Sequence, residues 1–478
     1  MALLVRSAAA YTAADVNTVF SAYNSEYYFQ SGTNGYFAND QSGGIEYFWS
    51  QAEEVECVID AYEWNPTPTT RSMVTNLLNG FLTVNGAIWT NKIYNDDIMW
   101  AAMAFCRGGM LTGMTNYCNV AKTNFDLTYA RAWDTVLGGG LYWTTDRGSK
   151  NACVNGPGSI AASLLYQAYN DSAYLAKATA IYNWERSVLF NTNSGAIYDN
   201  IGTNGVIGTW ASTYNQGTFL GAANFLGQTN EAALAVHFTM QNLTTGGVLP
   251  EYGINGNNSG FNAIYLRWMN RYVKNRGLQA LYSGWLQTNA VAAWSLRRTN
   301  DNLSWCQWLH ATPAGTNFNS WDAISSYEAL LAADPTQSMP AQPVAADMLG
   351  YWPLNEGSGT TAGDRSGNGN AGVINNATWS SSGRMGNCLV FNGATSYVQV
   401  TNPLANDFTI AFWVKTTQAN NAGNWYNGAG LVDGDTPGGA NDFGTALCSG
   451  KFAFGTGNPD QTIASSVAIN DGVWHHCV

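Results

Sequence analysis

Apolar residues recur at helical spacing through the first two thirds of the chain. Ile160, Leu164, Leu165 and Ala168, for example, fall on one face of a helix. The same pattern predicts twelve helices, at residues 12–29, 45–63, 70–84, 96–111, 117–136, 157–170, 173–190, 211–227, 230–242, 260–273, 276–298 and 319–333. This part of the chain is therefore expected to be all-α.

The helices follow a regular repeat. A glycine followed by apolar or aromatic residues separates successive helix pairs, at intervals of 51, 54, 55 and 52 residues. These glycines are Gly35, Gly86, Gly140, Gly195 and Gly247, and a degenerate sixth copy begins near Asn302. A period near fifty residues indicates stacked helical hairpins. Six hairpins suffice to close an (α/α)6 barrel, and an open solenoid is the alternative.

The pattern changes near residue 334. Residues 335–347 contain proline and no helical period, which is typical of a linker. Further on, short runs of alternating residues such as SYVQV (396–400) are separated by Gly and Asn turns. The chain is therefore predicted to be multidomain, with an all-α barrel at 10–334, the linker, and an all-β jelly-roll sandwich at 348–478.

Composition limits the partners. Only 11% of residues are charged, and the net charge is −12 at pH 7. No basic stripe exists to meet phosphates, so nucleic acid and anionic membranes are excluded, and no apolar run predicts a membrane span. Abundant aromatic and amide side chains suit a neutral, polyhydroxylated ligand. An acidic secreted protein without a preference for sugars is the alternative.

Cysteine and histidine usage argues against a metal site. The chain has eight cysteines and four histidines, with no CxxC pair and no zinc spacing. Cys57 and Cys106 fall in helical patterns and are expected to be buried, whereas a disulfide in the strand-rich region stays open. His237 and His310 have no evident partners and are interpreted as structural. The start, MALLVRSAAA, is a poor signal peptide, but a secreted or cell-surface monomer is expected.

The one Asp-Asp pair of the chain, Asp96 and Asp97, lies in YNDDIMW (94–100). One interpretation is structural: Asn95 caps the helix and the aspartates favour its dipole. The other is chemical, because Tyr94 and Trp100 flank the pair and would raise the pKa of one carboxyl. A glycosidase needs two such carboxyls, one as nucleophile and one as general acid.

Acids follow the glycine turns throughout the repeat. Since the turns are expected to gather at one rim of the barrel, these acids would line a single aromatic-walled cleft. They are Asp40, Asp96, Asp97, Asp146, Asp199 and Glu251. A cleft of this charge favours a neutral or cationic ligand.

Six stretches resemble glycoside hydrolase family 76, the α-1,6-mannanases. They are YFWSQAEEVE (47–56), IYNDDIMWAAMAF (93–105), GGGLYWTTD (138–146), KNACVNGPGSIAASLLY (150–166), STYNQGTFLGAA (212–223) and FNAIYLRWMNRYV (261–273). They occur in the order and spacing of the family. The resemblance implies an (α/α)6 barrel and a retaining reaction, with Asp96 as nucleophile and Asp97 as general acid/base. It implies no cofactor.

Further residues of these stretches are expected to bind substrate: Trp49, Tyr94, Trp100, Tyr142, Trp143, Asn151, Asn155, Tyr214, Asn215, Gln216 and Arg267. Trp143 is a candidate stacking platform, with a core aromatic as its alternative. Asn151 and Asn155 are placed in a loop before the helix at 157–170, where ordinary loop or cap residues are the alternative. For Arg267 the alternative is a buried structural ion pair.

Residues 348–478 resemble the laminin-G-like, concanavalin-type jelly roll, as in GYWPLNEGSG, LVFNGATSYVQV and DFTIAFWVKT. In those modules a DGxWHH segment is followed by further strands, whereas here DGVWHHCV (471–478) ends the chain. The jelly roll is therefore expected to be incomplete. DRSGNG from Asp364 resembles half of a calcium loop, but its twelfth position is Asn375 rather than Glu, so calcium stays open.

These features together support the hypothesis of a secreted glycosidase that cleaves α-1,6-mannan by double displacement, with a carbohydrate-binding jelly roll attached. Two alternatives remain. A transglycosidase would pass the mannosyl intermediate to another sugar, such as a cell-wall glycoprotein or GPI glycan. A non-catalytic glycan-binding protein would have kept the barrel without turnover.

Overall fold

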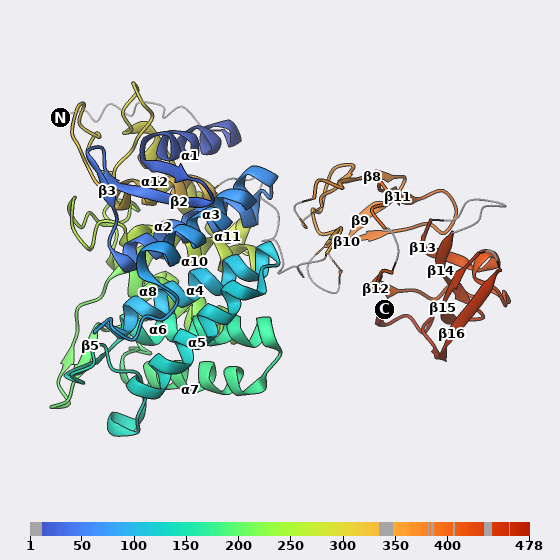
Figure 1. Ribbon diagram of the computed structural model, residues 1–478, viewed down its shortest axis with the longest axis horizontal. Coiled ribbons are helices and arrows are strands. Elements are labelled where there is room, and N and C mark those ends of the chain that lie inside the picture. The colour runs from blue at the N-terminus through green and yellow to red at the C-terminus, as the bar shows by residue number, and fades with distance from the viewer. Residues whose placement is uncertain are drawn as a thin grey trace. The chain divides into compact units, whose positions relative to one another are not determined.

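The computed structural model describes residues 12–333, 348–364, 366, 368–380, 382–383, 387–404, 407–434, 442–457 and 459–478. The chain divides into two compact units, the first ending at Met348 and the second spanning Leu349–Val478 (Figure 1). The predicted linker at 335–347 lies outside the described residues. No helix in the described part of the chain is long and apolar enough to cross a membrane.

The described part of the first unit contains twelve α-helices in two rings. The inner ring consists of α2 (Phe48–Trp64), α4 (Asn95–Thr112), α6 (Ala152–Tyr169), α8 (Thr213–Phe225), α10 (Phe261–Arg276) and α12 (Ser320–Ala333). The outer ring consists of α1 (Ala13–Tyr27), α3 (Pro68–Asn85), α5 (Thr115–Ala132), α7 (Ser172–Val188), α9 (Thr229–Asn242) and α11 (Gln279–Ser295). Each inner helix packs on the next, and α12 packs on α2, so the ring closes. The predicted (α/α)6 barrel is confirmed, and the open solenoid is wrong.

Burial explains the two rings. Nearly every residue of α2, α4 and α12 is buried, because an inner helix is covered on all sides. An outer helix such as α3 buries only one face, with Val74, Leu77, Leu78 and Phe81. The outer helices therefore bury one face, whereas inner helices such as α2 are buried around their circumference and hold charged side chains inside the barrel.

One helix start differs from the prediction. Apolar spacing predicts a helix at residues 157–170, but α6 begins at Ala152 and holds Pro157 in its sixth position. The missing proline N–H leaves the carbonyl of Cys153 without its helical donor. Asn155 consequently lies in the first turn of the helix and not in a loop.

The repeated glycine turns lead from an outer helix to the next inner one. Gly140, Gly195 and Gly247 all have φ near +85°, where L-residues are strained. A Cβ at Gly140 would also collide with Trp184 of α7. Four turns are held alike: a buried amide accepts from one backbone N–H and donates to a nearby carbonyl. The four amides are Asn124, Asn155, Gln216 and Asn289.

Short strands, which the sequence did not predict, accompany these turns. They form two antiparallel sheets: β1 (Tyr28–Ser31), β2 (Asn34–Asp40) and β3 (Gly43–Ile45), and β4 (Ser149–Asn151), β5 (Asn200–Gly202) and β6 (Ile207–Gly208). All of them lie in connections that enter an inner helix. The N-termini of the inner helices therefore share one end of the barrel with these strands, and their C-termini share the other.

The second unit is made of short antiparallel strands, as predicted for a jelly-roll region. They are β7 (Thr361–Ala362), β8 (Gly372–Asn375), β9 (Thr378–Ser380), β10 (Cys388–Val390), β11 (Tyr397–Gln399), β12 (Phe412–Lys415), β13 (Ala429–Asp433), β14 (Phe443–Cys448), β15 (Lys451–Thr456), β16 (Gln461–Ala468) and β17 (Trp474–Cys477). The largest sheet has the order β13-β14-β15-β16, with β14 buried along its whole length. All eight cysteines are free, and Cys57 and Cys106 are buried as expected.

Candidate active site

The start of α4 is fixed by its neighbour in the repeat. The backbone N–H of Asn95 donates to the Trp143 carbonyl (2.7 Å), and the Asn95 side chain donates to the Tyr142 carbonyl (2.8 Å). Tyr94 occupies the N-cap position, and no side chain caps the helix. The interpretation of Asn95 as a cap is therefore wrong. Asp96 and Asp97 are left in the first turn with their carboxyl groups available.

Asp97 is enclosed beside a tyrosine hydroxyl. Asp97 is only 4% exposed, and its Oδ2 accepts a 3.2 Å hydrogen bond from the Tyr47 hydroxyl. Burial raises the pKa of this carboxyl to about 6, while the Tyr47 hydrogen bond and the charge of Lys92 act in the opposite direction. Asp97 thus titrates near neutral pH.

Asp96 is half-buried and lies beside Cys153 of α6. Burial, and then the charge of Asp97, raise its pKa to about 7. The Cys153 thiol and the Trp143 indole lie close enough to lower that pKa. Oδ1 of Asp96 and Nε1 of Trp143 are nevertheless enclosed without a hydrogen bond of good geometry to any described residue. The hydroxyl group of a bound ligand would satisfy both, because it can donate to Oδ1 of Asp96 and accept from Nε1 of Trp143.

Aromatic rings from five inner helices surround the pair. The ring centroids of Trp49 and Trp100 lie 6.3 Å apart, and those of Trp100 and Tyr214 lie 6.4 Å apart. Tyr214 stacks on Phe261 at 3.8 Å, and Trp49 meets Trp321 edge-on at 5.0 Å. Trp100 is only 1% exposed, so it forms the floor beneath the rings and offers no free face to a ligand.

Tyr94 and Trp143 form a second aromatic pair beside the carboxyl groups. Their ring centroids lie 5.3 Å apart, and both side chains are half-buried. The indole of Trp143 is the one whose N–H lies next to Asp96. Both residues therefore remain suitable for stacking on a ligand, as the sequence predicts.

A third carboxylate completes the cluster. Asp199 Oδ1 accepts a 3.2 Å hydrogen bond from Asn215, and Asp199 Oδ2 accepts one of 2.8 Å from Asn200. Burial raises the pKa of Tyr214 far above its usual range, with Cys153, Asp199 and Asp96 adding to the effect. Asn215 thus contributes to the site through its hydrogen bond to Asp199.

Three of the acids expected in the cleft have other partners instead. Asp40 bonds to Ser42, and Asp146 bonds to Thr144 and the Gly148 N–H. Glu251 meets Nδ1 of His310 at 3.0 Å, which also corrects the expectation that His310 lacks a partner. The cleft acids are therefore Asp96, Asp97 and Asp199.

Two expected sugar-binding amides serve the glycine turns. Asn155 is fully buried and bonds to the N–H and carbonyl of Leu141, and Gln216 is fully buried and bonds to the backbone at Ile197 and Gly195. Their hydrogen-bonding groups are occupied by the fold. Asn155 and Gln216 have to be removed from the substrate-binding set.

Tyr142 and Asn151 also make contacts within the fold. Tyr142 is buried, and the Lys150 ammonium lies 4.5 Å from its ring centroid. Asn151 occupies the N-cap position of α6, where its Oδ1 accepts from the Ser149 hydroxyl. Both support the segment that holds α4, and neither has a contact with the carboxyl pair in the described structure.

Arg267 belongs to a buried ion network, which is the alternative considered for it. Its guanidinium pairs with Glu53 and Asp60 of α2. Arg107 of α4 pairs with Asp60 too, and also with Glu56 and Glu63. Because these side chains are at most 3% exposed, the network lies inside the barrel and Arg267 is not a ligand of the cleft.

Sequence reasoning missed several residues of the site: Tyr47, Lys92, Cys153 and Trp321. Tyr47 and Cys153 lie in stretches that match the family, but nothing local shows that they reach the aspartates. They approach because the N-termini of α2, α4, α6 and α12 converge. Only closure of the barrel brings them together.

The described residues hold no group of three or more His, Cys, Asp or Glu side chains that could bind a metal ion. In the predicted calcium loop, Asp364 accepts hydrogen bonds from the N–H groups of Tyr351, Ser366 and Asn370. The oxygens of Asp364 therefore hold the loop together by accepting these backbone hydrogen bonds.

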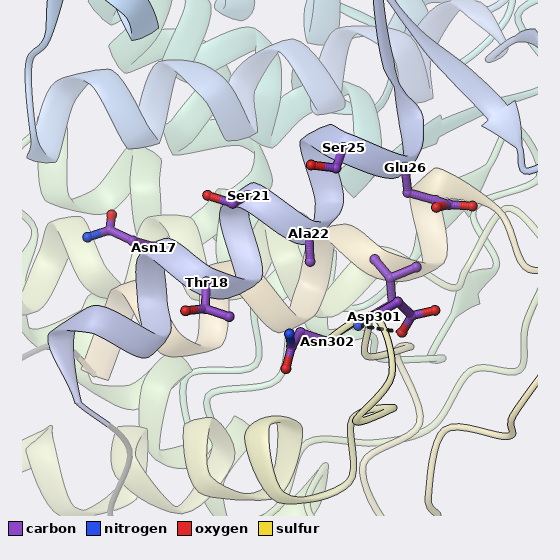
Figure 2. Close-up of a pocket in the computed structure, with 9 residues that line it drawn as sticks. Asn17, Thr18, Ser21, Ala22, Ser25, Glu26, Asp301 and Asn302 are labelled. Atoms are coloured by element: carbon purple, nitrogen blue, oxygen red, sulfur yellow. Dashed lines mark hydrogen bonds between the residues drawn. The ribbon is translucent and has the colours of Figure 1, made fainter.

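A polar groove of about 530 Å³ lies elsewhere, between α1 and the turn at Asp301–Leu303 (Figure 2). Figure 2 shows Asn17, Ser21 and Ser25 along α1, with Asn302 on the opposite side. No residue that lines the groove contacts the carboxyl pair, and none is aromatic. The groove is therefore separate from the site at the inner helices.

An (α/α)6 barrel whose mouth holds two neighbouring, enclosed carboxyl groups among aromatic rings has the features of a glycoside hydrolase. The chain matches the glycosyl hydrolase family 76 model over residues 5–347, and it belongs to that family. Residues 392–478 match the concanavalin A-like lectin/glucanases superfamily. No protein with a curated description matches the chain.

Solved structures similar to the chain cover its barrel. The α-1,6-mannanase GH76A of Salegentibacter sp. HEL1_6 is 28% identical, with a TM-score of 0.61 over 67% of this chain and 98% of its own. An inactive variant of that enzyme, with two consecutive aspartates changed to asparagine, was solved in complex with α-1,6-mannotriose. A family 76 glycoside hydrolase from a bovine Bacteroides thetaiotaomicron strain is 18% identical, with a TM-score of 0.57 over 67% of this chain and 77% of its own. Dfg5 from Chaetomium thermophilum, in complex with glucosamine, is 15% identical, with a TM-score of 0.59 over 72% and 95%. The last two show the fold alone.

Proposed function

We propose that this protein hydrolyses α-1,6-mannosidic bonds with retention of configuration. The observation that carries the proposal is the enclosed pair of Asp96 and Asp97, with pKa values raised to about 7 and about 6. A retaining glycosidase needs one ionised and one protonated carboxyl at neutral pH. The Salegentibacter mannanase supports the substrate, since its variant lacking two consecutive aspartates is inactive and is bound to α-1,6-mannotriose.

The proposed reaction has two steps. In the first, a carboxylate oxygen of Asp96 bonds to the anomeric carbon as the glycosidic bond breaks, and Asp97 gives its proton to the departing oxygen. In the second, Asp97 takes a proton from water as the water oxygen bonds to the anomeric carbon and releases Asp96. Both groups return to their starting states, and two inversions give net retention.

The roles require the proton to sit on Asp97 once substrate is bound. In the empty site Asp96 has the higher pKa, because the charge of Asp97 adds to the effect of burial. Positive charge develops on the anomeric carbon next to the nucleophile, and this charge favours the ionised form of Asp96. The transition state is therefore reached from the form in which Asp97 carries the shared proton.

The surroundings of the pair fit a neutral sugar. Half-buried Trp49, Trp143 and Tyr214 offer ring faces, and Asp199 offers an acceptor for hydroxyls. The second unit is proposed to bind carbohydrate, in keeping with its match to the lectin superfamily. The protein is proposed to act as a monomer outside the cell, where mannan is found.

The test is product release from unbranched α-1,6-mannan by the wild type, Asp96→Asn, Asp97→Asn and Asp171→Asn. Asp171 caps the outer helix α7, and asparagine caps equally well, so this variant controls for loss of one negative charge. Wild type and Asp171→Asn are expected to release mannooligosaccharides. The two site variants are expected to lose at least about 10²-fold in turnover.

Equal release by all four proteins would overturn the mechanism. A folded wild type that binds α-1,6-mannotriose without cleaving mannan would favour the non-catalytic alternative. The transglycosidase alternative uses the same carboxyl groups, so it is separated by adding an acceptor sugar. Products longer than the donor, at the expense of hydrolysis, would establish it.

A further inference from the structure

A second cavity lies at the opposite end of the barrel. It has a volume of about 280 Å³, and its polar lining consists mainly of Glu63, Arg107, Gln167, Asn224, Arg271 and Arg276. These residues stand near the C-terminal ends of α2, α4, α6, α8 and α10. Along α4, Arg107 lies about 16 Å from Asp96, so the cavity is not part of the carboxyl site.

Three guanidinium groups line this cavity, and Glu63 is the one carboxylate among its lining residues. Glu63 pairs both with Arg107 (2.6 Å) and with Arg271. Arg107 has further partners deeper in the barrel, but Arg271 pairs only with Glu63 among the described acids. Arg276 bonds only to the Asn224 side chain (2.9 Å) and the Asn224 carbonyl (2.7 Å). Positive charge is therefore in excess in the cavity, within a chain of net charge −12.

Two details of Arg107 and Arg271 favour a further acceptor in the cavity. The Arg107 side chain is only 2% exposed, and its Nε is fully enclosed without an acceptor in the described structure. Burial lowers the pKa of Arg271, and the nearby Glu63 does not offset this. An unmet buried donor and a poorly compensated buried cation both favour an acceptor with negative charge in the cavity.

We propose that this cavity binds a small oxyanion, a phosphate or a carboxylate, between Arg271 and Arg276. The planar fork of a guanidinium matches the paired oxygens of both groups. The competing role of these arginines is to offset the partial negative charge at the C-terminal ends of the inner helices. That role needs no bound ion.

Thermal unfolding of the full chain tests the proposal, because an ion that binds the folded state raises the midpoint. Sodium phosphate and sodium acetate are each titrated against sodium chloride at constant ionic strength. The proteins are the wild type, Arg276→Gln, Arg271→Gln and Arg186→Gln. Arg186 is an exposed arginine of α7 paired with Glu231, so its variant makes the same change of charge elsewhere.

Phosphate or acetate at about ten times its dissociation constant is expected to raise the midpoint of wild type and Arg186→Gln by about 2–4 °C. Arg276→Gln is expected to lose this rise, and it should fold normally because Arg276 is exposed and bonds only to Asn224. The salt that raises the midpoint identifies the oxyanion as a phosphate or a carboxylate. No rise in wild type, or an equal rise in Arg276→Gln, would overturn the proposal. A midpoint that the arginine variants lower equally in all three salts would assign them to the helix ends.

Discussion

The hydroxyl of Tyr47 donates a 3.2 Å hydrogen bond to Oδ2 of Asp97, a residue fifty positions further along the chain. Tyr47 is 52% exposed, whereas Asp97 is 4% exposed, so this bond connects the surface to the enclosed carboxyl. Burial and the charge of Asp97 raise the pKa of Tyr47 to about 12. The phenol therefore remains a donor throughout the neutral range.

Removing this donor is expected to shift the pH dependence of the reaction. The hydrogen bond from Tyr47 lowers the pKa of Asp97, so Tyr47→Phe should raise it. If Asp97 is the proton donor, the alkaline limb of the kcat/KM profile moves up by about half a pH unit. The control is Tyr28→Phe, whose hydroxyl bonds to Gln30 away from the pair. An unchanged alkaline limb in Tyr47→Phe would show that Asp97 does not supply the proton.

The wild type is expected to have a narrow, bell-shaped pH profile. The pair has pKa values of about 6 and about 7, so it holds one proton between them. Below pH 6 both carboxyls are protonated and the nucleophile is lost, while above pH 7 both are ionised and the general acid is lost. The kcat/KM for mannooligosaccharides should peak between pH 6 and 7 and fall about tenfold per unit beyond. Activity that still rises at pH 9 would contradict the assignment.

The buried network predicts a large effect on stability. Arg267→Met leaves Glu53 and Asp60 without one of their cations inside the barrel, which is expected to cost about 3–5 kcal/mol of unfolding free energy. Arg186→Met breaks an exposed pair with Glu231 and is expected to cost about 1 kcal/mol or less. Urea unfolding of both variants compares the two costs. Equal midpoints would mean that the network does not stabilise the barrel.

The barrel could be predicted because its signals are local and repeated. Helical spacing recurs in six helix pairs and the glycine turn in five of the copies, so an error in one copy does not change the count. The start of α6 could not be placed, because Pro157 normally marks a first turn and here lies within the helix. The short strands were missed because β4 and β6, for example, are only two or three residues long.

The carboxyl pair could be predicted because its two residues are adjacent. The amides show where such reasoning fails. Asn155 and Gln216 stand at the starts of inner helices, in stretches that also contain the site residues Cys153 and Tyr214. What distinguishes the amides is their partner, a strained glycine turn 14 to 21 residues earlier. That contact depends on how the hairpins stack, which no local pattern reveals.

The division of roles between Asp96 and Asp97 can be decided by the stereochemistry of azide products. With 2,4-dinitrophenyl α-mannoside the leaving group needs no proton, so Asp97→Ala should still form the mannosyl-enzyme on Asp96. Hydrolysis of that intermediate is slow without a base. Azide needs no base and fits the space of the lost carboxyl. It should therefore restore turnover and give the α-mannosyl azide, with retained configuration.

Asp96→Ala should behave differently, because azide would then replace the nucleophile itself. It attacks the anomeric carbon from the side that Asp96 occupied, in a single displacement, and the product is the β-mannosyl azide. The anomeric configuration of each product is read by NMR. A β-azide from Asp97→Ala together with an α-azide from Asp96→Ala would reverse the two roles while keeping the pair. No azide product from either variant, both being folded, would mean that neither carboxyl forms or resolves a mannosyl-enzyme.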